Sequence, residues 1–164
     1  MPFFKRLKKN FIHKKERTMK HIKSERGQSL VELAISISIL VFLLAGAVEF
    51  GLVFFQYVQL RDAAQEGALY GSTSPPLSAG DTAKIDIIKN RAKAASTSPI
   101  DLTGDPNVTI AVLVTDGKYC EGGSLQVTVS YPHKVFMPFM SKFIGPTVQL
   151  DAVVTDTILQ PLCP

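Results

Sequence analysis

The sequence predicts an α+β protein. We expect a long N-terminal transmembrane helix that continues outward, followed by a small exterior domain in which an antiparallel sheet of three or four strands packs on a helix. Three observations predict this class. A basic segment precedes a long apolar run, the polar continuation of that run is rich in helix formers, and apolar residues after Asn107 recur at every second position.

Positive charge is concentrated in residues 1–27. They hold ten Lys or Arg against Glu16 and Glu25, a net charge of +8, whereas the remaining residues hold eight Lys or Arg against twelve Asp or Glu, a net charge of −4. A basic tail can bind nucleic acid or an anionic membrane surface. Because a long apolar run follows directly, we interpret it as the cytoplasmic end of a membrane protein and expect no nucleic-acid partner.

A single membrane-spanning helix is predicted between Leu33 and Phe55, where the one charged residue is Glu49. Such a helix reaches ~34 Å, enough to cross a hydrocarbon core of ~30 Å. A buried soluble helix is the first alternative, but the rest of the chain is too small to cover a helix that is apolar on every side. A cleaved secretory signal is the second, but its apolar region runs only ~7–15 residues.

The helix is expected to continue past the membrane to Gly71. Leu60, Ala64 and Ala68 recur every four residues, and the prolines at positions 75 and 76 then end the helix. The predicted organisation is therefore a basic leader over residues 1–27, a transmembrane and membrane-proximal helix over 28–71, and an exterior α+β domain over 72–164.

The exterior domain is expected to begin with a helix over residues 82–96, capped by Asp81. Its apolar stripe is spaced by three, four and three residues: Ile85, Ile88, Ala92 and Ala95. Alternating apolar residues predict strands over 108–114, 125–132 and 147–159, and residues 116–123 connect the first two.

Two cysteines, Cys120 and Cys163, both fall on the predicted exterior side. In an oxidising compartment such a pair can close a disulfide, and two free thiols are the alternative.

The chain is poor in residues that carry catalysis. After the basic segment it has one histidine, His133, which we interpret as a surface or loop residue rather than a general base. No zinc spacing and no phosphate-binding loop motif occur. We therefore expect no enzyme, no metal and no cofactor.

The most informative motif is RGQSLVE, residues 26–32, at the start of the apolar run. It resembles the leader junction of type IV pilin-like proteins, which a prepilin peptidase cuts after the glycine. The resemblance implies cleavage between Gly27 and Gln28, with Glu32 as the fifth mature residue. A carboxylate there favours the positive end of the helix dipole and can pair with a freed α-amino group.

The run over residues 26–70 is similar to TadE-like proteins of tight-adherence (Tad) pilus systems. The similarity rests on R-G-x-x-x-V-E and on a membrane-proximal R-x-A-A-x-E-G-A-x-Y element, formed here by Arg61, Ala63, Ala64, Glu66, Gly67, Ala68 and Tyr70. Residues 107–160 resemble the family more loosely. The resemblance implies the cytoplasmic (inner) membrane, with the N-terminus in the cytoplasm, and leaves the TadE, TadF and TadG-like branches open. It also implies partners: the prepilin peptidase, a Flp-type pilin, other pseudopilins, the assembly platform and membrane lipid.

One face of the apolar helix carries small residues and one acid: Ala34, Ser38, Ala45 and Glu49. At 100° per residue they fall within about 60° of one another, which predicts a helix–helix contact face. The alternative for Glu49 is that it only reaches the outer membrane interface.

Together these features predict a minor pseudopilin that assembles Tad/Flp pili through helix contacts in the membrane. The alternative is an uncleaved, membrane-anchored exterior binding or adhesion module.

Overall fold

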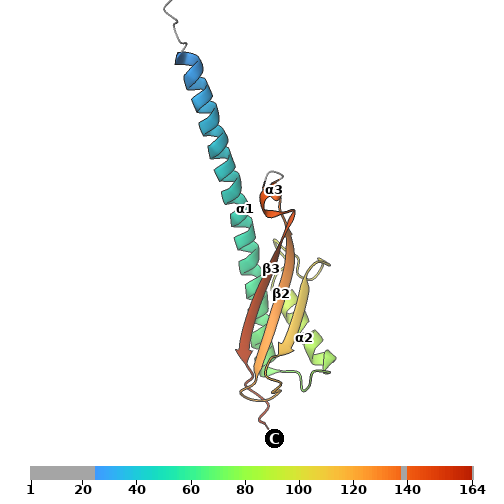
Figure 1. Cartoon of the computed structure of the whole chain (residues 1–164). Helices are drawn as coiled ribbons and strands as arrows, with labels where there is room; N and C mark the ends of the chain where they lie inside the picture. Colours follow the sequence, from blue (N-terminus) through green and yellow to red (C-terminus); the bar gives the residue numbers. More distant parts are fainter. Residues whose placement is uncertain (1–24, 138–139, 164) are drawn as a thin grey trace, which may run out of the picture. The chain divides into compact units, whose positions relative to one another are not determined.

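The computed structural model describes residues 25–137 and 140–163, and it confirms the α+β class (Figure 1). The elements are α1 (Glu25–Thr73), α2 (Thr82–Ala94), β1 (Thr109–Val114), β2 (Ser124–Lys134), α3 (Ser141–Ile144) and β3 (Thr147–Thr157). The predicted leader lies mostly in residues 1–24, outside the described residues.

The chain divides into two units, Met1–Ile39 and Leu40–Pro164. In the first unit the described residues belong to α1, which begins at Glu25 rather than at residue 28 as predicted. Among the described residues, α1 is the helix long and apolar enough to cross a membrane, and none of its most apolar window is buried. These properties fit a single-pass membrane anchor.

The second unit is built on a three-stranded antiparallel sheet in the order β1-β2-β3. The register aligns Val112, Val127 and Val154 across the three strands, so their side chains share one face. The pairing of β1 with β2 ends at Ser130. Residues 131–134 of β2 therefore pair with β3 alone and form an edge of the sheet. Pro132 is tolerated there because no β1 acceptor needs its missing N–H.

The C-terminal part of α1 packs together with α2 against the inward face of this sheet. The fully buried core side chains include Leu60, Ile88, Leu125, Val127 and Val129. In α2, Ile88 and Ala92 are buried as the stripe predicted, whereas Ala95 is exposed because the helix ends at Ala94. Asp81 caps α2 as expected, accepting a hydrogen bond from the Lys84 backbone N–H at 3.2 Å.

Small residues let α1 approach the rest of the unit closely. A Cβ on Gly71 would lie 2.1 Å from Leu125 Cδ2 and 3.3 Å from Ile88 Cδ1. A Cβ on Gly67 would lie 3.1 Å from Ala92 Cβ. The lack of a Cβ at these two glycines makes room for the neighbouring side chains, and neither glycine has a positive φ angle.

Two further connections hold loops to this core. The buried side chain of Gln59 on α1 donates to the Ile100 carbonyl at 2.8 Å and accepts from the Ile100 backbone N–H at 3.3 Å. Near the C-terminus, a disulfide joins Cys120 to Cys163 with a Cα–Cα distance of 5.2 Å. Residues 116–123 form the β1–β2 connection that holds Cys120.

Candidate functional site

The predicted cleavage residues lie on an exposed turn of α1. Gly27, Gln28 and Glu32 line one side of an open hollow, together with Val31 and Ile35. The helix runs through Gly27 and Gln28 without a break, and the Glu32 side chain is exposed. The structure thus describes the turn on which cleavage is predicted, but it does not test the cleavage itself.

The four residues of the predicted contact face have different surroundings. Ala34 and Ser38 are exposed, and the Ser38 hydroxyl donates to the Ala34 carbonyl at 2.8 Å. In the second unit, Ala45 is half-buried and Glu49 is 3% exposed. Contact of this face with another helix stays a prediction, while the Glu49 carboxylate has partners within its own chain.

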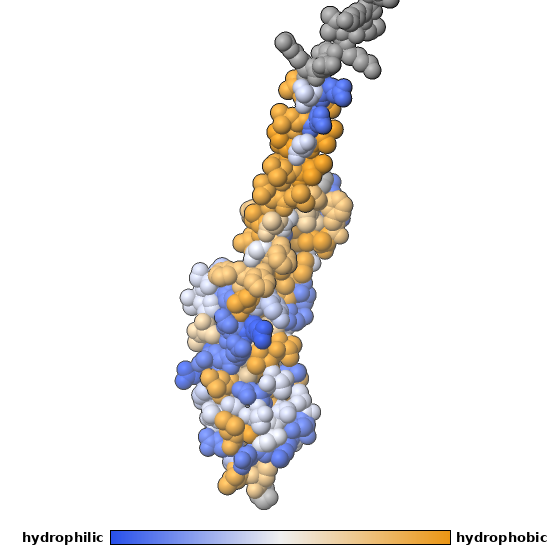
Figure 2. All heavy atoms as spheres, turned by 90° about the vertical axis from the view of Figure 1, so that its left-hand side faces the viewer, coloured by the Kyte–Doolittle hydropathy of each residue, from blue (hydrophilic) through white to orange (hydrophobic). Residues whose placement is uncertain are grey.

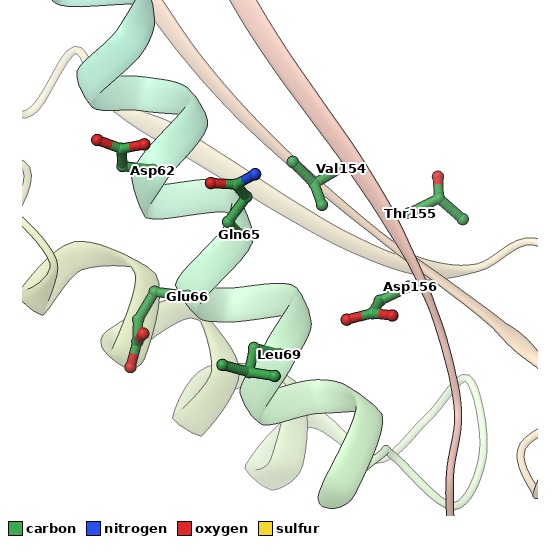
Figure 3. A pocket seen from close by; sticks show the side chains of 7 residues that line it. All are labelled: Asp62, Gln65, Glu66, Leu69, Val154, Thr155 and Asp156. Atoms are coloured by element: carbon green, nitrogen blue, oxygen red, sulfur yellow. The ribbon is translucent and has the colours of Figure 1, made fainter.

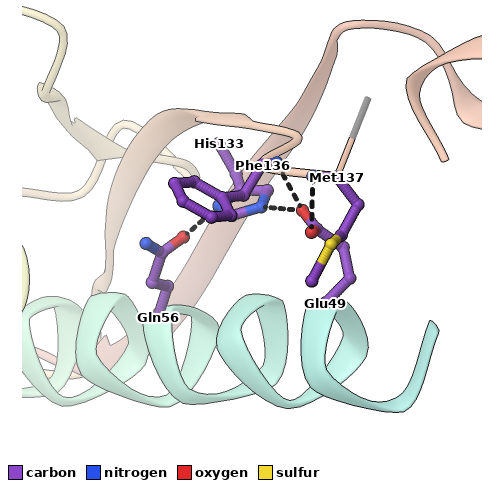
Figure 4. A network of polar contacts seen from close by, with 5 residues as sticks. All are labelled: Glu49, Gln56, His133, Phe136 and Met137. Carbon is purple, nitrogen blue, oxygen red and sulfur yellow. Dashed lines mark hydrogen bonds and ion pairs between the residues drawn. The ribbon is translucent and has the colours of Figure 1, made fainter. Parts of the chain in front are cut away.

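Glu49 is the centre of a buried polar network between α1 and the end of β2 (Figure 4). Its Oε1 lies 3.0 Å from His133 Nε2 and accepts from the Phe136 backbone N–H at 3.0 Å. Its Oε2 accepts from the Met137 backbone N–H at 3.2 Å. A single carboxylate therefore satisfies three donors from one segment, which fastens that segment to α1.

The second ring nitrogen of His133 is also engaged. His133 Nδ1 lies 2.6 Å from Gln56 Oε1, one to two helical turns beyond Glu49 on α1. Both ring nitrogens thus have partners on α1, which fixes the orientation of the imidazole. The Glu49–His133 contact is buried, with side chains 4% and 5% exposed. An imidazole held in this way orients a segment and has no free nitrogen to act as a base.

The interpretation of His133 as a surface or loop residue was wrong. It is 4% exposed and lies on strand β2, whose inward face carries Leu125, Val127 and Val129. His133 lies four residues after Val129, so the same alternation places its side chain on the inward face. The two-residue period was therefore the signal that could have predicted its burial. Its partners on α1 have no comparable local signal.

A groove between α1 and β3 gathers polar side chains (Figure 3). Gln65 and Leu69 lie on the side of α1 toward β3, where Asp156 faces them, whereas Asp62 and Glu66 point to the other side of the helix. The carboxylates therefore do not converge. Within the described part of the chain, no group of three or more His, Cys, Asp or Glu residues could hold a metal ion.

The membrane-proximal element of α1 serves packing. Ala63, Ala64 and Ala68 are fully buried against the sheet and α2. Arg61 and Glu66 are exposed. Tyr70 is half-buried, and the Arg91 guanidinium of α2 lies 5.2 Å from its ring centroid, at cation–π distance. The alternation of small and polar residues in this element therefore reflects one face against the core and one against solvent.

These features define a class of protein with one long helix. The N-terminal part of α1 fits a single-pass membrane anchor, and its C-terminal part packs in the core of a small α+β unit. Residues 27–69 match the family model described as TadE-like protein, so the chain carries a TadE-like segment. The matched range begins at Gly27 and contains Glu32, Glu49 and the small-residue element. Comparisons with curated proteins and with solved structures return no match.

Proposed function

We propose that this protein is a TadE-like minor pseudopilin that acts in the assembly of Tad/Flp pili. The single observation that carries the proposal is the family match over residues 27–69, which begins at the residue before the expected cut. Pilus assembly is the role that this family suggests, and it is structural rather than catalytic.

The mechanism has four steps. The basic leader keeps the N-terminus in the cytoplasm of the inner membrane, following the positive-inside rule. A prepilin peptidase then cuts between Gly27 and Gln28. The new α-amino group pairs with Glu32, its own or that of a neighbouring pilin, which lowers the cost of both charges in lipid. The anchored helix then contacts the Flp-type pilin, other pseudopilins and the assembly platform.

Mass spectrometry of the mature N-terminus tests the cleavage step. With an active prepilin peptidase we expect a chain beginning at Gln28, and Gly27→Ala should retain the leader because a Cβ obstructs the approach of the peptidase to the backbone. Gly46→Ala is the matched control, since a Cβ there meets nothing within 4 Å. A wild-type chain that still begins at Met1 contradicts the cleavage step.

Piliation tests the assembly step separately. Deletion of the protein should abolish or reduce Tad pili, and Glu32→Gln should be cut normally yet restore piliation poorly. Normal piliation in the deletion strain would instead support an uncleaved, membrane-anchored binding module.

A further inference from the structure

The β2–β3 connection exposes large apolar side chains at one end of the second unit. Phe136 is 78% exposed, Phe143 is 70% exposed and Ile144 is 48% exposed. We call these three residues the loop face. Scattered exposed apolar residues are ordinary on a protein surface, but two exposed phenylalanines and an exposed isoleucine on one short connection favour an interaction site.

The loop face lies beside the apolar part of α1. The rings of Phe143 and Phe42 are 6.3 Å apart between centroids, at an interplanar angle of 67°. Phe42 is flanked on α1 by Leu43 and Leu44, which are 62% and 57% exposed. Figure 2 shows hydrophobic surface gathered along this part of the helix and beside it. The loop face therefore continues the surface of the helix segment that fits a membrane anchor.

We propose that the loop face, formed by Phe136, Phe143 and Ile144, contacts the lipid bilayer beside α1. The proposal goes beyond the proposed function and does not depend on cleavage or on pilus assembly. It makes this short connection a second membrane contact of a protein anchored by one helix.

Several backbone N–H groups in the described part of the connection have acceptors within the protein, as lipid demands of non-helical chain. Glu49 accepts from the backbone N–H groups of Phe136 and Met137. The Val135 N–H donates to the Pro146 carbonyl at 3.0 Å. The N–H groups of Phe143 and Ile144 both donate to the Met140 carbonyl, at 2.9 and 3.1 Å. These donors do not need water, and they leave apolar side chains outward.

The same geometry explains why an acid is tolerated at position 49. Glu49 lies toward the outer end of the predicted span from Leu33 to Phe55. There its carboxylate is covered by the connection and paired with His133 instead of facing lipid.

Lipid is the occupant that the placement favours over a second protein copy. The loop face continues the surface of the helix segment that fits a membrane anchor. In α3, the exposed Lys142 directly precedes Phe143 in the sequence. A lysine side chain can extend along an apolar surface and place its ammonium group among anionic headgroups.

Single tryptophans test the proposal, because the natural sequence contains none. Phe143→Trp and Phe136→Trp are made separately in the full chain and placed in phosphatidylcholine–phosphatidylglycerol nanodiscs, at no more than one copy per disc, with and without brominated acyl chains. Leu43→Trp on α1 is the reference for lipid contact. Leu77→Trp, at a site 67% exposed in the turn after α1, is the matched control.

We expect both loop variants to emit at short wavelength and to lose as large a fraction of their emission to brominated lipid as Leu43→Trp does. Leu77→Trp should keep its emission. If brominated lipid quenches the emission of both loop variants no more than that of Leu77→Trp, the proposal is overturned. Long-wavelength emission would then show that water surrounds these side chains, and short-wavelength emission that protein covers them. Circular dichroism verifies that each variant folds. If Phe143→Trp does not fold, the quenching of Phe136→Trp alone tests the proposal.

Discussion

The Glu49 carboxylate and the His133 imidazole meet at 3.0 Å although 84 positions separate them in the chain. The contact joins the segment of α1 that fits a membrane anchor to the end of the central strand β2. It also sets the position of the β2–β3 connection, because the same carboxylate accepts from Phe136 and Met137. Anchor helix and sheet are thus coupled by a charged group rather than by apolar packing alone.

Removing the Glu49 carboxylate should destabilise the second unit. Glu49→Leu leaves His133 Nε2 and two backbone N–H groups without their acceptor, and each buried donor left unsatisfied costs about 1–3 kcal/mol. Glu49→Gln keeps one acceptor oxygen and should cost less. Thermal unfolding of the full chain in mild detergent micelles measures both changes.

The matched control for Glu49 is Glu66→Leu, an exposed acid on the same helix. Surface substitutions of this kind usually change stability by no more than about 0.5 kcal/mol. If Glu49→Leu cost as little as Glu66→Leu, the network would have no stabilising role. A double-mutant cycle with His133→Leu isolates the pair, and we expect clear non-additivity.

Gly71→Ala should weaken the packing of α1 on the sheet. The added methyl would lie 2.1 Å from Leu125 Cδ2, and Leu125 is a fully buried core residue that would have to shift. Overpacking of this kind costs about 1–3 kcal/mol. Gly51→Ala is the control, because a Cβ there meets nothing within 4 Å and alanine gains roughly 1 kcal/mol in helix propensity. Equal melting temperatures for the two variants would contradict the close approach.

Gln59→Leu should loosen the loop that follows α2. The Gln59 amide pairs with both the N–H and the carbonyl of Ile100, and leucine would leave these two buried backbone groups unsatisfied. We expect a loss of about 1–3 kcal/mol for each orphaned group. Amide hydrogen exchange at Ile100 should accelerate more than exchange in β2. Unchanged protection at Ile100 would show that water replaces the side chain without cost.

Local patterns predicted most of the secondary structure but not the polar contacts between distant elements. The helix predicted over residues 82–96, its Asp81 cap and the three strands follow from spacing within a few residues. The structure has all of them, with the helix ending at Ala94. The partners of Gln59 and Glu49 lie 41 and 84 positions away. Periodicity reports which face of an element is buried, whereas it carries no information on which residue of another element completes a hydrogen bond.

Acid should weaken the second unit through Asp105. The backbone N–H and side-chain amide of Asn107 donate to its carboxylate at 2.9 and 2.7 Å and, with smaller contributions from Tyr131 and Lys134, hold the pKa of Asp105 below its ordinary 3.8. A group whose pKa is lower in the folded state contributes stability above its unfolded pKa and loses it as pH falls through the folded value. Stability should therefore fall as pH drops below about 4.

Asp105→Asn should make this loss of stability at low pH shallower. Asp62→Asn, which changes an exposed acid on α1, is the control and should leave it unchanged.

Asp105→Asn should also change the stability at alkaline pH. Burial, the Asp105 charge and the Asp105 hydrogen bond raise the pKa of Tyr131 above 10.0, so its neutral form contributes stability below that pH and loses it as pH rises through the raised value. Asp105→Asn should lower the pKa of Tyr131, seen as earlier ionisation of one tyrosine in an ultraviolet titration. An identical titration in both variants would show that Asp105 and Tyr131 do not interact.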